Sequence, residues 1–462
     1  MTRRLPTLSE NAWLLLALAL LLLSLLAGRG SVGSQLSLAW LPVGALLVVA
    51  VAQPRAGLMA LVLVFPARPA LEAAHGPSAL QLLGVAVLAG TGARWLRERR
   101  RLRVGLPHAV LAGLVGLGAA SLTVEVGASS VWNLTTWVKA LALSIAVVEL
   151  VGSREALWRM CAAFAVSASL TAALMLADFL PYALGAFDSP DPMRYRWTVS
   201  PDSSTLATFL GAGCVAVLPL LDPVRAGWRR VLPWGLAVLS FAGVIALGSR
   251  LVWLAALFAG AVYLVGGRGV GGRCRRAVTF VALPLVIGGL GLALGLSDPT
   301  LGKRVSRTTE SVHKASGGRS DIWRVGWRIV AAHPLRGVGL GNFPRHFDDA
   351  SQVMEPPIRS RPGRSPHNVF LGLWAELGFL APLALLAALA LLVRPLLRSP
   401  AGGAAWLAIL AYLLAVMVGQ DQLGTLHPWV IFGLLAAAGR VEQESPTGID
   451  REYPARRPDR AS

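Results

Sequence analysis

The chain has 462 residues, a formal net charge of +19 and a mean hydropathy of +0.61. Hydrophobic residues make up 55% of it and charged residues only 15%, which excludes an ordinary soluble globular protein. Apolar runs of about 17 to 25 residues recur along the chain, and a helix of that length crosses a hydrocarbon core of about 30 Å. The alternating pattern of barrel strands does not occur, so we predict an all-α, polytopic membrane helix bundle.

The apolar runs predict about twelve to fourteen membrane helices. The first begins near Ala12 and resembles a signal peptide, but it lacks a small-x-small cleavage pattern, so we interpret it as an uncleaved helix. In chain order the predicted helices are 12–28, 36–52, 57–72, 77–96, 106–123, 131–151, 157–180, 204–221, 231–248, 251–266, 277–296, 369–393, 403–419 and 426–439.

Short basic clusters between these runs predict the orientation. With a cytoplasmic N-terminus, all of them fall on the cytoplasmic side, as the positive-inside rule requires. The clusters are Arg97 to Arg103, Arg225 to Arg230, Arg268 to Arg276, Arg394 to Arg398 and the tail after Arg440. Because the basic residues are spread over many short loops, the charge of +19 indicates membrane orientation and not nucleic-acid binding. The cysteines Cys161, Cys214 and Cys274 lie in or beside membrane runs and imply no disulfide framework.

Five regions follow from this layout. They are N-terminal membrane helices (1–180), central helices with Arg-containing external loops (181–296), a large external loop (297–367), C-terminal helices (368–440) and a cytoplasmic tail predicted to be disordered (441–462). The large loop carries twelve Lys or Arg against six acids, more positive charge than orientation favours on the external side. We therefore expect it to bind an anionic lipid or a sugar phosphate.

Within this loop, residues 320–332 predict an amphipathic helix. Ile322, Trp323, Trp327 and Val330 recur at helical spacing, while Arg324 and Arg328 lie four apart. Ser320 or Asp321 can cap its start and Pro334 ends it. We expect the helix to lie flat on the membrane surface, where the two arginines either bind a substrate phosphate or touch lipid headgroups only.

Two short motifs follow. The glycine-rich segment from Gly337 to Phe343 neither follows a strand nor opens a helix, which excludes a dinucleotide fingerprint and predicts a tight turn against a neighbour or a ligand. Ser365-Pro-His367-Asn368 then precedes an apolar run, so His367 is expected at the mouth of a membrane helix.

This order of motifs resembles the O-antigen ligase and polymerase family over roughly Pro181 to Val393. Gly248-Ser-Arg250 resembles the family's short Ser-Arg turn, and Arg196 to Ala207 resembles a segment that usually continues with Pro-Asn, where this chain has Pro201-Asp202. The other matching positions are Gly318-Arg319-Ser-Asp-Ile-Trp323, Pro334, Gly337, Gly339, His367-Asn368, Leu371, Glu376 and Gly378.

The resemblance implies a glycosyltransferase of the GT-C type that moves a glycan from an undecaprenyl-pyrophosphate carrier to an acceptor hydroxyl. It implies that Arg250 and Arg319 engage the pyrophosphate and that His367 acts at the acceptor. Arg196, Arg324, Arg328 and Asn368 are further candidates for substrate binding.

Elementary chemistry agrees with these roles. A departing pyrophosphate gathers negative charge, which the permanently charged fork of Arg can stabilise. An acceptor hydroxyl needs a base, and a histidine with an ordinary pKa of about 6.5 beside arginines would be neutral. The alternatives are that Arg250 anchors a helix at the membrane interface, that Arg319 pairs with Asp321, and that His367 only caps a helix.

Other charged residues carry weaker signals. Lys139 and Asp178 lie within apolar runs and are functional candidates, unless they are close enough to a surface to be solvated. His346, Asp348 and Asp349 have metal-ligand side chains, but no second ligand cluster accompanies them, and the first external loop (28–35) has no acid. No metal and no cofactor are expected.

The sequence thus favours an inverting, metal-independent glycosyltransferase of the bacterial inner membrane with its site on the periplasmic face. Its partners would be the carrier-linked glycan, a lipid A core or growing glycan as acceptor, and membrane lipids. A polymerase with the same chemistry stays open. Rivals are a lipid-linked glycan transporter, for which midplane charges would be expected, and a structural scaffold.

Overall fold

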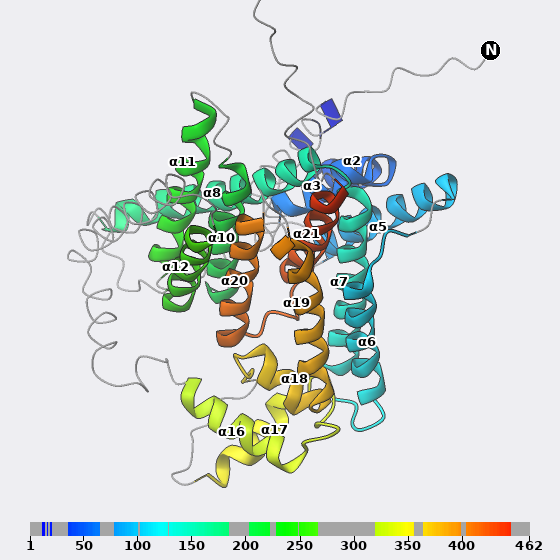
Figure 1. Ribbon diagram of the computed structural model, residues 1–462, viewed down its shortest axis with the longest axis vertical. Helices are drawn as coiled ribbons and strands as arrows, with labels where there is room; N and C mark the ends of the chain where they lie inside the picture. Colours follow the sequence, from blue (N-terminus) through cyan, green and yellow to red (C-terminus); the bar gives the residue numbers. More distant parts are fainter. Residues whose placement is uncertain are drawn as a thin grey trace, which may run out of the picture.

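The computed structural model describes residues 36–64, 78–99, 102–127, 129–183, 203–221, 228–247, 249–266, 319–354, 364–398 and 403–444, with a few positions between 12 and 20. Fifteen α-helices and one 3-10 helix occur in this part, and no strand does, so the predicted all-α fold is confirmed (Figure 1). The helices are α2 (Leu36–Ala52), α3 (Pro54–Val64), α5 (Ser78–Glu98), α6 (Leu106–Ser121), α7 (Ser130–Leu150), α8 (Arg154–Ala183), α10 (Ser203–Ala216), η2 (Leu218–Leu220), α11 (Trp228–Ala246), α12 (Arg250–Val265), α16 (Arg319–Ala332), α17 (Phe343–Gln352), α18 (Val369–Leu377), α19 (Leu380–Arg398), α20 (Gly403–Gly419) and α21 (Leu426–Glu444).

Three of the described helices are long and apolar enough to cross a membrane, namely Ser130–Leu150, Arg154–Leu176 and Leu380–Arg398. Seven further apolar helices of 10 to 17 residues accompany them. Large hydrophobic side chains such as Val85 and Leu254 are exposed on the outer faces of the helices, as a lipid-facing surface requires. The chain is therefore an all-α membrane protein, while the full number of its crossings stays a prediction.

Small residues let the helices of the bundle approach closely. A Cβ at Gly433 of α21 would lie 2.6 Å from the carbonyl oxygen of Ser144 on α7, so only glycine fits this crossing. α12 lies along α20 in the opposite direction, because Leu251 packs on Gly419 while Gly266 packs on Ala404. Arg250 therefore lies at the end of the bundle where α20 ends.

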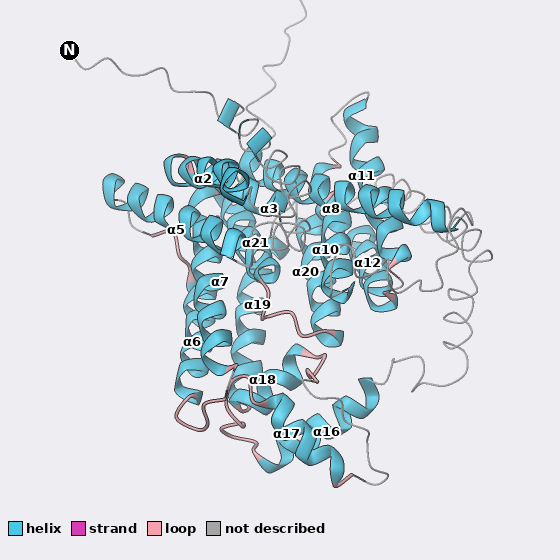
Figure 2. Cartoon of the chain, turned by 180° about the vertical axis from the view of Figure 1, so that it is seen from behind, coloured by secondary structure: helices cyan, strands magenta, loops and turns pink. Residues whose placement is uncertain are grey.

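Helices α16, α17 and α18 form a small unit at this end, which we call the cap subdomain (residues 319–354 and 364–377). Figures 1 and 2 show it beyond the ends of α19 and α20, beside the connection between α6 and α7. It has its own hydrophobic core, separate from that of the bundle. Its fully or largely buried members are Ile322, Val325, Ile329, Val330, Val338, Phe343, Phe347, Leu371 and Ala375.

The predicted glycine turn is confirmed, and the neighbours it meets are protein. Gly337, Gly339 and Gly341 adopt φ values of 66°, 91° and 78°, a region that costs other residues strain. A Cβ at Gly337 would lie 2.3 Å from the backbone of Glu376. The turn thus runs in close contact with α18.

The apolar run 369–393, expected as one membrane helix, is two helices. Gly378 adopts φ 82°, and a Cβ there would lie 1.9 Å from the carbonyl oxygen of Leu335. Phe379 N then donates to the carbonyl oxygen of Pro334 at 3.1 Å instead of continuing the helix. The prediction was wrong because tertiary contacts with the glycine turn override the apolar pattern. His367 precedes the nine-residue helix α18 of the cap subdomain, not a membrane helix.

The amphipathic helix predicted at 320–332 is α16, but protein covers its apolar face. Ile322, Val325 and Ile329 are buried against α17 and α18. Trp327 is 54% exposed and meets the ring of Trp374 edge-on at 5.5 Å. Protein packing thus replaces the lipid contact that was expected for this face.

Several predicted features lie outside the described residues. These are the helix 277–296, most of the first helix, the loop segments 184–202, 267–318 and 355–363, the tail after 444, Arg196, and the side chain of Asp178.

Replacing Gly378 by Ala tests the break between α18 and α19. The substitution forces a Cβ into Leu335 and a left-handed backbone onto alanine, so we expect a loss of about 1 to 3 kcal/mol in stability, or failure to fold. Thermal unfolding of the detergent-solubilised protein measures it. Gly113→Ala is the matched control, since no atom lies within 4 Å of its Cβ position. Equal melting temperatures for the two variants would contradict the described break.

Candidate functional site

Two arginines that are distant in the sequence meet where the cap subdomain faces the bundle. Arg250 is the first residue of α12, after the N-cap Ser249, and Arg319 is the first residue of α16. Burial lowers the pKa of Arg319, and the positive charge of Arg250 lowers it further. The two half-buried guanidinium groups are therefore near each other. Their repulsion favours an anion between them.

Glu376 ties α18 to the glycine turn. Its Oε1 accepts a hydrogen bond from Phe343 N at 3.2 Å. Burial raises its pKa to about 8, although the backbone amide of Gly341 opposes this shift; the charge of Asp421 raises the pKa further. This carboxyl group is therefore largely protonated at neutral pH, and it supports the turn as a hydrogen-bond acceptor.

Asp421 lies in the connection between α20 and α21, next to the end of α20 that Leu251 contacts. Burial raises its pKa to about 6. Its side chain keeps exposed area, so water moderates this shift more than it does for Glu376. Asp421 was not predicted, because the polar triplet Gln420-Asp421-Gln422 reads from the sequence as an ordinary loop between two apolar runs.

A buried polar network holds this connection in place. Thr208 of α10 donates from Oγ1 to Gln420 Oε1 at 2.7 Å, and Tyr412 donates to the carbonyl oxygen of Thr208 at 2.6 Å. Thr425 Oγ1 donates to the carbonyl oxygen of Gln422 at 2.7 Å. The side chain of Gln420, before Asp421, is thus held by α10, and the backbone of Gln422, after it, is held by Thr425 of the same connection.

His367 lies at the start of α18 in a strained backbone conformation, with φ 47°. Its Nδ1 lies 3.5 Å from Ser365 Oγ. Pro366 packs so closely on α18 that a Cβ at Gly372 would lie 2.7 Å from its ring. This packing fixes the turn, and residues held in such conformations often have a functional role.

Of the other predicted substrate-binding residues, Asn368, Arg324 and Arg328 do not join the arginine pair, and Arg196 lies outside the described residues. Asn368 Oδ1 accepts from Leu371 N at 3.0 Å and so caps α18. Arg324 and Arg328 lie on the exposed face of α16, with Arg328 Nη1 4.0 Å from Met354 Sδ. Arg324 and Arg328 follow Arg319 by five and nine positions, which places them on the opposite side of the helix from Arg319.

His346, considered above for a metal site, has another role. Its Nε2 lies 3.2 Å from Glu125 Oε2, and Arg345 pairs with the other carboxylate oxygen of Glu125. Glu125 belongs to the connection between α6 and α7. These contacts fasten α17 to the bundle.

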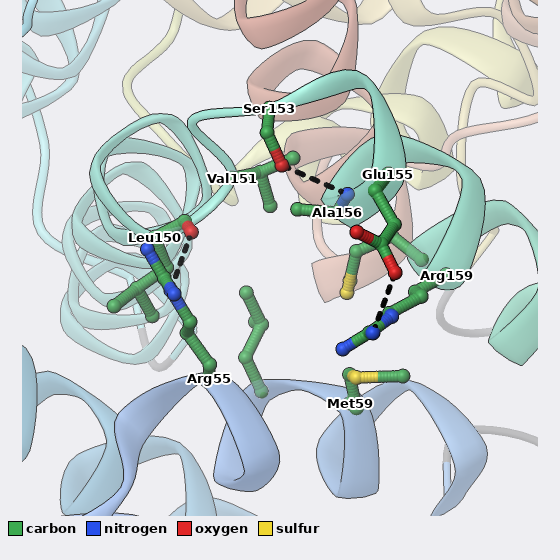
Figure 3. Close-up of a pocket in the computed structure, with 10 residues that line it drawn as sticks. Arg55, Met59, Leu150, Val151, Ser153, Glu155, Ala156 and Arg159 are labelled. Carbon is green, nitrogen blue, oxygen red and sulfur yellow. Dashed lines mark hydrogen bonds and ion pairs between the residues drawn. The ribbon is translucent and has the colours of Figure 1, made fainter. Parts of the chain in front are cut away.

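A small cavity lies at the end of α7 that is away from the cap subdomain. Figure 3 shows that protein atoms satisfy its polar groups. Arg55 Nε donates to the carbonyl oxygen of Leu150 at 3.1 Å, and Arg159 pairs with Glu155 at 2.6 Å. Its volume is ≈ 70 Å³. The hydrogen bond of Arg55 joins α3 to α7, and the cavity is not a candidate site.

Residues 235–386 match the family model described as O-antigen ligase. The predicted resemblance is thereby confirmed over these residues. The matching segment contains Arg250, Arg319, His367 and Glu376, whereas Asp421 lies beyond it. No curated protein matches the chain.

Substitution of Glu376 by Gln tests the raised pKa of this carboxyl group. Between pH about 4.5 and 8 the folded carboxyl keeps a proton that the unfolded chain has lost, so wild-type stability should fall as pH rises through this window. Gln keeps the hydrogen-bond acceptor but does not titrate. The pH dependence of the free energy of unfolding should therefore be weaker in the variant, by up to about 1.4 kcal/mol per pH unit. Melting temperatures from pH 5 to 8 measure the difference. Glu155→Gln, at an exposed pair, is the control; equal slopes for wild type and Glu376→Gln would refute the assignment.

Proposed function

We propose that this protein is a membrane glycosyltransferase that moves a glycan from an undecaprenyl-pyrophosphate carrier to an acceptor hydroxyl, as an O-antigen ligase does. Its family indicates membrane glycosyl transfer of the ligase or polymerase type. The finer proposal is an inverting, metal-independent reaction on the periplasmic face of the bacterial inner membrane, with a lipid A core sugar or a growing glycan as acceptor.

The proximity of Arg250 and Arg319 carries this proposal. One side chain comes from the bundle and the other from the cap subdomain, and the charge of the first lowers the pKa of the second. A pyrophosphate is an anion with several oxygens, and two guanidinium forks can bind it in a bidentate manner. Such a ligand would relieve the repulsion and stabilise the charge of the departing group.

His367 is the proposed base. In the proposed step, an imidazole nitrogen removes the proton of the acceptor hydroxyl while the hydroxyl oxygen attacks the anomeric carbon. The bond from this carbon to the pyrophosphate oxygen breaks, and the electron pair leaves with the carrier pyrophosphate beside the arginines. Attack opposite the leaving group inverts the anomeric configuration.

A transporter is disfavoured, because the paired arginines are the first residues of α12 and α16 and so lie at helix ends, not near the middle of a membrane helix. A reconstituted assay separates the two classes. Formation of a glycosidic product with donor and acceptor on one side of the membrane supports an enzyme, whereas movement of the donor without product supports a carrier.

Transfer by purified variants tests the site residues. Asn tolerates a left-handed backbone, so His367→Asn should keep the turn but remove the base and lower the rate at least about a hundredfold. Arg319→Lys keeps the charge without the fork, and we expect a loss of about a hundredfold. The measurement is glycan transfer from an undecaprenyl-pyrophosphate-linked donor.

Arg398→Gln is the charge control for this assay, since Arg398 is exposed at the end of α19 that is away from the cap subdomain. It should keep wild-type activity. All variants should melt like the wild type. Full activity of His367→Asn would refute the base assignment, and full activity of Arg319→Lys would refute bidentate binding.

Glycan profiling of a deletion strain separates ligase from polymerase. A ligase joins finished polymer to its acceptor, so its loss should remove all lipid A-attached polymer. A polymerase joins repeats to each other, so its loss should leave single-repeat caps. Unchanged glycans after deletion would contradict both assignments.

A further inference from the structure

Lys139 lies near the middle of the apolar helix α7 and lines a groove that the proposed reaction does not use. The groove runs between α5 and α7 and is closed at one end by Gly424, Thr425 and Leu426. Its cavity volume is ≈ 100 Å³. A cation within a membrane helix is costly, which makes it a candidate for ligand binding.

The groove places no negative charge beside this cation. Lys139 Nζ lies 5.4 Å from the centre of the Trp132 ring, above its face. The polar residues that line the groove, Gln81, Thr136 and Thr425, are all neutral. In the part of the chain that the structure describes, no carboxylate forms an ion pair with Lys139. The wall is thus cationic with neutral hydrogen-bonding groups.

The rim of the groove is apolar and exposed. Val85 of α5 is 52% exposed, and Trp132 of α7 is 58% exposed. Leu80, Leu88 and Leu143 continue this apolar wall inside the groove. An occupant must therefore combine a long apolar part with a negative head, which is the chemistry of a phosphate-bearing lipid.

The direction of the lysine side chain agrees with such a head group. Trp132 precedes Lys139 by about two helical turns, and side chains on a helix tilt toward its N-terminus. The Lys139 stem thus extends along apolar surface toward the end of α7 that contacts the cap subdomain through Ser130 and Leu340.

We propose that this groove binds a lipid through its phosphate, with Lys139 as the cation, the side-chain amide of Gln81 as a hydrogen-bond donor and the α5–α7 wall around the chain. Thr425 belongs to the same connection as Asp421, so the bound head group lies beside the segment that borders the candidate site. The lipid is either an acidic phospholipid or an isoprenyl phosphate. Lipid binding does not depend on the proposed transfer reaction.

Native mass spectrometry of the full chain in detergent tests the site with three probes: phosphatidylglycerol, zwitterionic phosphatidylcholine and undecaprenyl phosphate. The wild type should bind at least one anionic probe in preference to phosphatidylcholine. Lys139→Gln should weaken that binding about fivefold, the effect of one cation near an anionic head group, and Lys139→Arg should retain it.

Arg398→Gln should bind like the wild type and controls for total charge. Trp132→Leu serves as a second variant that keeps the lysine but removes the aromatic face, and it should weaken binding less than Lys139→Gln. Preference for undecaprenyl phosphate assigns the groove to the carrier, and preference for phosphatidylglycerol assigns it to a structural lipid. Equal anionic-lipid binding by wild type and a Lys139→Gln protein with unchanged melting temperature overturns the proposal, whatever the outcome of the transfer assay.

Discussion

The docking of the cap subdomain on the bundle depends on the backbone of the glycine turn. Val338 N donates to the carbonyl oxygen of Ala375 at 2.9 Å, while Ser130 Oγ donates to that of Leu340 at 2.6 Å, so one short segment is bonded to both bodies. Left-handed glycines let the chain approach both neighbours without a Cβ clash. Arg319 belongs to one body and Arg250 to the other, so their proximity requires this attachment.

Near this attachment, the carboxyl group of Glu376 is not under the influence of the positive charges of Arg250 and Arg319. A carboxyl group beside two arginines would have a lowered pKa, because cations favour its charged form. The pKa of Glu376 is instead raised to about 8, with burial as the largest cause and Asp421 adding to it. The arginines therefore do not neutralise this acid. The acid serves the turn as a hydrogen-bond acceptor.

Hydropathy predicted most helices well because lipid imposes length and composition on each of them, as the close agreement at 36–52 and 403–419 shows. It failed at 369–393, where the contacts of Gly378 with Leu335 decide the fold and an apolar pattern carries no trace of them. The motifs predicted Arg250, Arg319 and His367 as site residues, and these roles stay predictions. The motifs missed Asp421, because a polar loop of three residues has no periodicity, and its neighbours come from α10 and α18.

One helix of the cap subdomain shows why charge counting could not assign roles to individual arginines. In α16, Arg319 lies on the face that includes the buried Ile322 and Gly326, whereas Arg324 and Arg328 face outward. The first is half-buried beside another cation, which is unfavourable unless an anion binds, while the other two are solvated and cost little. The sequence placed all three in one basic segment. Only packing separates the half-buried guanidinium group of Arg319 from the exposed ones of Arg324 and Arg328.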